Sequence, residues 1–297
     1  MNGEIINRIS LFLRLIRIDN LLFLSYLQFS IYWLVYKQQI SGISHSGNLN
    51  DIFPIWIFPT FFIMALGNLI NDFFDFKGDI INNKRPSGKG EISKKEILTL
   101  VYILSGLVIT SIVISQNYIP RAFEIYGIIS ICIFAYSKWL KCIPLLGNLL
   151  IALLCSIAVL FPIMFTYEIY SSSLQPFIAG FIYFVFIITL IREIVKDLED
   201  MKGDKATHCK TLPIRIGEKT TKIIALIITV SSLIMATFWA TFFEMPLVVS
   251  IFILTVLPLI YVSFQFSQSN NFFEISRTLK MIMLSSSLLI FIFHYSS

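Results

Sequence analysis

The chain has 297 residues, of which 56% are hydrophobic and only 14% are charged, and its mean hydropathy is +0.79. Soluble domains carry roughly 25% charged residues, so this composition excludes a water-soluble globular fold and indicates an integral membrane protein. The net charge of +5 predicts no nucleic-acid partner, because the basic residues cluster beside the apolar segments in the way that membrane topology requires.

Apolar segments recur along the whole chain, and a helical crossing needs about 20 such residues. Residues 1–19 form a charged amphipathic segment, and we expect it to lie at the membrane interface. Crossings are predicted at residues 20–37, 53–71, 96–115, 121–137, 144–166, 174–192, 221–241, 245–264 and 278–295. The predicted fold class is therefore an all-α integral membrane protein with nine transmembrane helices, forming a single domain over residues 1–297.

The distribution of lysine and arginine predicts the orientation of these helices. All the basic residues except Lys37 and Arg121 fall on one side of the predicted crossings. Cytoplasmic loops retain positive charge, so the N-terminus and the segments 72–95 and 193–220, predicted as loops, should face the cytoplasm of a bacterial or archaeal-type cell membrane. The cysteines have no metal-type spacing, and we expect free thiols at Cys132, Cys142, Cys155 and Cys209.

One internal repeat carries candidate chemistry. Residues 72–79 and 197–204 both read Asp-x-x-Asp-x-Lys-Gly-Asp, and each follows a predicted crossing at its cytoplasmic end. The repeat predicts two four-helix units followed by a ninth helix. Residues at i, i+3 and i+7 share one face of a helix, so the aspartates of each copy should project together. They are Asp72, Asp75 and Asp79, and Asp197, Asp200 and Asp204.

These two acidic clusters predict a metal site. A single cluster could be a solvated helix end, but like charges one turn apart destabilise a helix and charges near the bilayer usually mark function. Mg²⁺ takes oxygen ligands and is typically held by one or two carboxylates together with substrate phosphates. We therefore predict that all six aspartates bind Mg²⁺ and through it a diphosphate, with Asp72, Asp75, Asp197 and Asp200 central to catalysis.

The basic residues on the same side suit phosphate oxygens. The candidate diphosphate contacts are Arg85, Lys138, Lys141, Arg192 and Lys196. Neutralising a departing diphosphate would let its allylic carbon acquire carbocation character, and an acceptor would then capture that carbon. Tyr136, near the end of the fourth predicted crossing, is the aromatic favoured to stabilise the cation through its ring face.

At these residues the sequence resembles the UbiA-type superfamily of intramembrane prenyltransferases. The first family motif is matched by Asn71, Asp72, Asp75, Asp79, Arg85 and Pro86, the second by Asp197, Asp200 and Asp204, and an intervening segment by residues 136–141. The resemblance implies a nine-helix bundle around a central cavity that opens to lipid, with Mg²⁺ and the diphosphate beneath the cytoplasmic loops. It adds Asn71 and Arg17 to the diphosphate contacts, although Ile18 stands where the family usually has proline.

Within the family, residues 192–204 and 209–214 are similar to enzymes that transfer geranylgeranyl onto geranylgeranylglyceryl phosphate. The expected function is Mg²⁺-dependent transfer of an isoprenyl group, with geranylgeranyl favoured, from its diphosphate to that lipophilic acceptor. Prenylation of an aromatic acceptor, such as a quinone, tocopherol or chlorophyll-type precursor, is the alternative. A divalent-cation transporter and a catalytically silent scaffold are more distant readings. Membrane lipid is an expected partner, and no obligate protein partner is evident.

Overall fold

A computed structural model describes residues 2–40, 53–83, 86–87, 89–164, 174–268 and 271–296. Within these ranges the chain forms helices and turns and no strand, which confirms the predicted all-α class. The helices are α1 (Asn2–Ile16), α2 (Ile18–Ile40), α3 (Phe53–Asn82), α4 (Lys94–Gln116), α5 (Ala122–Lys138), η2 (Leu140–Cys142), α6 (Leu146–Met164), α7 (Leu174–Ala206), α8 (Leu212–Ile216), α9 (Glu218–Ala240), α10 (Met245–Ile251), η3 (Phe252–Val256), α11 (Leu257–Gln268), α12 (Phe272–Ser286) and α13 (Leu288–Ser296).

Eight helical stretches in the described ranges are long and apolar enough to cross a membrane. The chain is therefore a multi-pass integral membrane protein. Helix α5, with 17 residues, coincides with the crossing predicted over 121–137 and is close to the shortest usual transmembrane length. The count of nine crossings remains a prediction.

Helices α3 and α7 are longer than predicted. They have 30 and 33 residues, and at 1.5 Å per residue they extend about 45 and 50 Å, well beyond a hydrocarbon core about 30 Å thick. The extra turns contain the two aspartate motifs. The prediction that 72–95 and 193–220 are loops is therefore wrong for residues 72–82 and 193–206, because continuous helical hydrogen bonding carries both motifs past the apolar segments.

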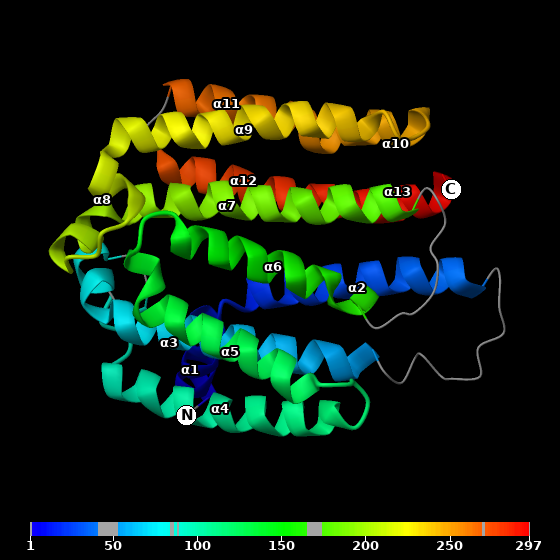
Figure 1. Ribbon diagram of the computed structural model, residues 1–297. Helices are drawn as coiled ribbons and strands as arrows, with labels where there is room; N and C mark the ends of the chain where they lie inside the picture. The colour runs from blue at the N-terminus through cyan, green and yellow to red at the C-terminus, as the bar shows by residue number, and fades with distance from the viewer. Residues whose placement is uncertain are drawn as a thin grey trace. The chain divides into compact units, whose positions relative to one another are not determined.

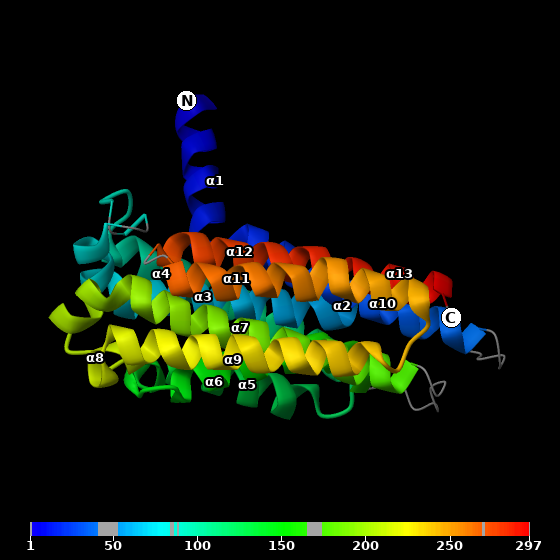
Figure 2. The same cartoon turned by 90° about the horizontal axis from the view of Figure 1, so that it is seen from above.

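The chain divides into two compact units. Unit 1 comprises Met1–Tyr26, Gly47–Ile143 and Asp200–Lys210, and unit 2 comprises Leu27–Ser46, Pro144–Glu199 and Thr211–Ser297. In unit 1, helix α3 packs against both α4 and α5, and α1 also contacts α3 (Figure 1). In unit 2, α11 packs against α9 and α12, and α10 packs against α13 (Figure 2). Helices α2 and α7 each contribute residues to both units.

The break between α1 and α2 is local and centred on Arg17. This residue has a φ of 56°, in the left-handed region that ends a helix. The N–H of Asn20 donates to the carbonyl of Arg17 at 2.9 Å, so the chain re-enters a helix at once. Just before the break, Leu15 and Ile16 enter an apolar cluster of unit 1 that includes Leu69 and Ile97. Arg17 is thereby held beside α3.

Two of the cysteines differ from prediction. Cys142 and Cys209 form a disulfide, whereas Cys132 and Cys155 are free thiols as expected. The bonded residues are 67 positions apart, and no sequence spacing could indicate their pairing. The prediction of free thiols is wrong for this pair because folding of unit 1 brings η2, after α5, beside the turn that follows α7.

Candidate active site

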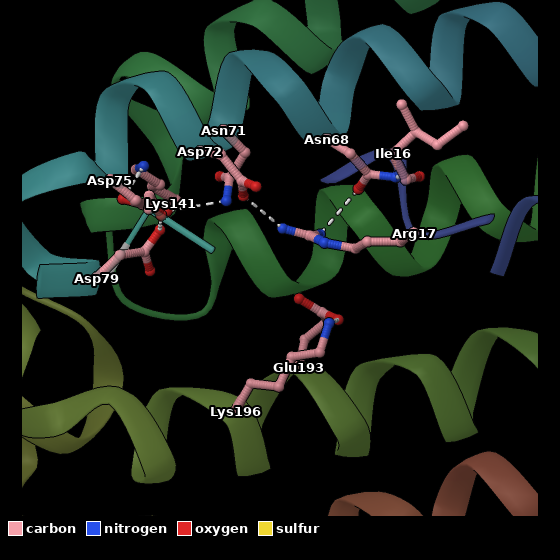
Figure 3. A network of polar contacts seen from close by, with 11 residues as sticks. Ile16, Arg17, Asn68, Asn71, Asp72, Asp75, Asp79, Lys141, Glu193 and Lys196 are labelled. Carbon is pink, nitrogen blue, oxygen red and sulfur yellow. Dashed lines mark hydrogen bonds and ion pairs between the residues drawn. The ribbon is translucent and has the colours of Figure 1, made fainter. Parts of the chain in front are cut away.

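The first aspartate of the first motif is held by an arginine and an asparagine. Asp72, on α3, has a side chain only 2% exposed, and its Oδ1 accepts from Nη2 of Arg17 at 2.8 Å. Nη1 of Arg17 donates to Oδ1 of Asn68, also at 2.8 Å, and Nδ2 of Asn68 donates to the carbonyl of Ile16 (Figure 3). Asn68 therefore fixes the guanidinium from one side while Asp72 fixes it from the other.

The second aspartate faces a lysine. Asp75 lies nearly one turn after Asp72 and forms an ion pair with Lys141 of η2 (Figure 3). Its other carboxylate oxygen accepts from Nδ2 of Asn71 at 2.8 Å. The Lys141 side chain is 14% exposed, so this charge is largely withdrawn from solvent. Asn71, Asp75 and Lys141 thus form one polar group in unit 1.

The third aspartate of the first motif accepts a hydrogen bond from the segment that follows α3. Asp79 is buried, and its Oδ2 accepts from the hydroxyl of Ser87 at 3.0 Å. Asn83, with a φ of 50°, ends the helix, which suits the tolerance of asparagine for left-handed geometry. Arg85, the predicted diphosphate contact in this segment, lies outside the described residues.

The second motif occupies the end of α7. Asp200 and Asp204 belong to unit 1 together with the whole first motif, whereas Asp197 belongs to unit 2. In unit 2, Oδ2 of Asp197 accepts from Nδ2 of Asn148, an amide buried in α6, at 2.9 Å. In unit 1, the Nδ2 of Asn82 lies 3.4 Å from Oδ1 of Asp200.

The two predicted basic residues of α7 surround a glutamate in unit 2. Glu193 is buried, with 10% side-chain exposure, and forms an ion pair with Lys196 one turn later (Figure 3). Nη1 of Arg192 lies 3.8 Å from the same carboxylate oxygen. Both cations are therefore engaged with a protein carboxylate.

The remaining candidates lie at the end of α5. Tyr136 is partly buried, and its role as a cation-stabilising ring stays a prediction. Lys138 is exposed, with its Nζ 4.4 Å from the centroid of the Trp139 ring. Of the two lysines predicted in this segment, the structure brings Lys141 rather than Lys138 to the first motif.

The donor set of the first motif fits a hard divalent cation. Among the described residues, no three His, Cys, Asp or Glu side chains are already arranged around one point as metal ligands. Instead the carboxylates of Asp72 and Asp75 are paired with Arg17 and Lys141. Oδ1 of Asn71, which directly precedes Asp72, is buried without a hydrogen-bond partner among the described residues. Buried acceptors normally have partners, and a free carbonyl oxygen beside two carboxylates matches the all-oxygen ligands that Mg²⁺ takes.

Sequence reasoning missed several polar side chains that contact the predicted site residues within each unit. They are Asn68, Asn82, Ser87, Asn148 and Glu193. A usable signal was present for Asn68 and Asn148, since each is an amide inside a strongly apolar segment, where polar side chains usually have a defined partner. Ser87 and Asn82 carry no such signal, because serine and asparagine are ordinary residues at and just after a helix end.

Comparison with known proteins identifies the family. The UbiA prenyltransferase family matches residues 28–286, which contain both aspartate motifs. The chain belongs to this family. It is 39% identical over 177 residues to the digeranylgeranylglyceryl phosphate synthase of Methanobrevibacter smithii, covering 56% of this chain and 59% of the relative. It is 30% identical over 231 residues to the synthase of the same name from Methanosphaera stadtmanae, covering 75% of this chain and 81% of the relative.

The alignment spans only about three fifths of several relatives, including 62% of the synthase from Methanosarcina mazei, which is 37% identical. Among solved structures, this UbiA family member superposes on a digeranylgeranylglyceryl phosphate synthase with a TM-score of 0.64, 26% identity and 98% coverage of both chains. A UbiA homologue from Archaeoglobus fulgidus bound to DMAPP and Mg²⁺ gives a TM-score of 0.61 at 16% identity, covering 94% of this chain and 99% of that one. At that identity the second likeness concerns the fold.

Proposed function

We propose that this protein is a Mg²⁺-dependent prenyltransferase that transfers geranylgeranyl from its diphosphate to geranylgeranylglyceryl phosphate and releases diphosphate. The observation that carries the proposal is the cluster in unit 1, where the first-motif carboxylates are held by Arg17 and Lys141. The names of the curated relatives support the acceptor. The fold shared with a homologue bound to DMAPP and Mg²⁺ supports the donor class.

The residues that would hold Mg²⁺ are the six motif aspartates, with the amide oxygen of Asn71 as a further acceptor. They are Asp72, Asp75, Asp79, Asp197, Asp200 and Asp204. Bound Mg²⁺ would supply charge neutralisation for the departing diphosphate.

Positively charged side chains of the protein would bind the oxygens of the diphosphate directly. Arg17 offers a planar guanidinium already oriented by Asn68, and such a group suits phosphate oxygens. Lys141 offers a point charge at the level of Asp75. Both are compensated by carboxylates within the protein, so diphosphate and its metal ions would replace these pairs without leaving a buried charge alone.

Arg192 and Lys196, compensated by Glu193 in unit 2, are proposed to act in the same way, as are Arg85 and Lys138. Tyr136 is proposed to face the allylic cation.

The proposed topology is nine crossings as one domain, built as two four-helix repeats and a ninth helix around a cavity, with the N-terminus and both motifs cytoplasmic and residues 1–19 at the interface. The basic residues beside the motifs support this orientation. Reporter fusions after residues 90 and 118 would test it. The first should report the cytoplasm and the second the opposite side, and the same side for both would contradict the proposal.

The reaction itself is tested with purified protein in nanodiscs, labelled geranylgeranyl diphosphate, Mg²⁺, and either geranylgeranylglyceryl phosphate or aromatic acids. We expect product with the glyceryl phosphate lipid, and we expect its loss with chelator and with Asp72→Asn or Asp197→Asn. Product with only the aromatic acids would show that the acceptor is aromatic and not the glyceryl phosphate lipid. Undiminished transfer by a folded Asp72→Asn protein would remove the first motif from the mechanism.

A further inference from the structure

The two copies of the repeat meet at their glycines in unit 1. Gly78 and Gly203 occupy the same place in the two Asp-x-x-Asp-x-Lys-Gly-Asp motifs. A Cβ added at Gly203 would lie 2.9 Å from the carbonyl oxygen of Gly78, closer than real Cβ contacts. A Cβ at Gly78 would lie 3.9 Å from the backbone of Gly203. The ends of α3 and α7 therefore approach backbone to backbone, which only small residues permit.

The residue four positions after each glycine lies against the glycine of the other motif. Asn82 lies over Gly203, with its Nδ2 2.4 Å from where a Cβ would be placed, and Thr207 lies over Gly78, with Cγ2 at 3.6 Å. The crossing is thus nearly symmetric in packing. It is not symmetric in polar contacts, and this difference distinguishes the two residues.

Both polar atoms of the Asn82 side-chain amide contact residues of α7. Its Oδ1 accepts from the backbone N–H of Gly203 at 3.0 Å. This contact orients the amide so that Nδ2 faces Asp200, 3.4 Å from the carboxylate Oδ1 and 3.5 Å from the backbone carbonyl. Thr207, in contrast, donates from its hydroxyl to the carbonyl of Gly203 at 3.0 Å, within its own segment. At this crossing the first-motif helix therefore supplies a donor to an aspartate of the second motif through Asn82, whereas the Thr207 hydroxyl donates within its own segment.

We infer that Asn82 is a positioning residue, which holds the Asp200 carboxylate in place for metal binding and so couples the geometry of the second motif to the first. The inference rests on the proposed function, in which Asp200 binds Mg²⁺. A carboxylate ligand that a neighbouring residue orients by a hydrogen bond binds metal better than a carboxylate that rotates freely. Loss of such a hydrogen bond typically reduces metal affinity about 10-fold to 100-fold.

The test measures Mn²⁺ binding by electron paramagnetic resonance, in the presence of inorganic diphosphate, on the full-length protein in detergent. Asn82→Leu keeps the branching of the side chain, with larger methyl groups in place of the amide atoms, and removes both polar contacts, and we expect its Mn²⁺ affinity to fall about tenfold. Asn82→Ala serves as the second variant if leucine perturbs the crossing. The matched control is Thr207→Val, which keeps packing over Gly78, and we expect affinity unchanged from the parent. Thermal unfolding midpoints verify that each variant is folded.

Asp200→Asn distinguishes a failure of the positioning role of Asn82 from a failure of the proposed metal site. If it weakens Mn²⁺ binding while the folded Asn82 variants bind like the parent, the positioning role is wrong and the proposed metal site stands. If Asp200→Asn itself binds like the parent, the proposed role of Asp200 fails and the inference fails with it. Equal losses in the Thr207 and Asn82 variants would also overturn it, because packing alone would then explain the effect.

Discussion

Nη2 of Arg17 lies 2.8 Å from Oδ1 of Asp72, 55 residues further along the chain. The Asp72 side chain is 2% exposed and the Arg17 side chain 25% exposed. A buried charge that loses its partner is costly, so Arg17 stabilises unit 1 through its ion pair with Asp72. One residue thereby links the break after α1 to the first motif.

Removing this arginine should destabilise the fold. For Arg17→Ala we expect a loss of about 2–4 kcal/mol in the free energy of unfolding, somewhat below the cost for a fully buried pair because the guanidinium is partly exposed. Thermal or denaturant unfolding in detergent measures it. Arg14→Ala is the control, since Arg14 pairs with Glu91 at 2.7 Å but is 51% exposed, and exposed pairs contribute about 1 kcal/mol or less.

The double variant Arg17→Ala with Asp72→Asn should recover much of that stability, because it removes the buried charge as well as its partner. If the single and double variants are equally unstable, the loss arises from packing rather than from an unpaired Asp72.

A methyl group at the glycine crossing should also destabilise unit 1. Gly203→Ala places a Cβ 2.9 Å from the carbonyl oxygen of Gly78, and the backbone shift should cost about 1–3 kcal/mol. Gly106, in α4, has nothing within 4 Å of its added Cβ, so Gly106→Ala should stay within about 1 kcal/mol of the parent. Unfolding midpoints compare the two. A larger loss for Gly106→Ala would contradict the close approach.

Substitutions of the two lysines near the end of α5 should have different effects on kcat/KM. Lys141 pairs with Asp75, whereas Lys138 is exposed beside Trp139. If Lys141 contacts the diphosphate, Lys141→Ala should reduce kcat/KM about 100-fold, the effect of losing one group that stabilises a developing anion. Lys138→Ala should give a smaller loss. Steady-state transfer assays with varied prenyl diphosphate measure both, and the reverse order would remove Lys141 from the site.

The disulfide between Cys142 and Cys209 should stabilise the protein, and cysteine alkylation should detect it. Alkylation of the unfolded, unreduced chain should modify Cys132 and Cys155 and leave Cys142 and Cys209 unmodified. Cys142→Ser with Cys209→Ser should lower the free energy of unfolding by about 2–4 kcal/mol. Serine at the two free positions is the control. Modification of all the cysteines without reductant would show that the bond does not form.

The amino-acid sequence by itself determined the membrane-spanning class and the positions of most crossings, because bilayer thickness fixes the length of an apolar helix. It also determined the aspartate motifs, because a repeated i, i+3, i+7 spacing can be read without coordinates. The extension of α3 and α7 through these motifs was less visible, since polar residues after an apolar segment are typical of both a loop and a solvated helix turn.

Tertiary structure alone decided the partners of those aspartates. Arg17 reaches Asp72, Lys141 rather than Lys138 reaches Asp75, and Cys142 bonds Cys209, each across a separation that carries no local signal. The repeat made both motif glycines visible, but only the packing of α3 on the end of α7 placed Gly78 beside Gly203. The physical reason is the same in each case: periodicity reports which face of its own helix a residue occupies, whereas the partner on that face depends on how distant segments pack.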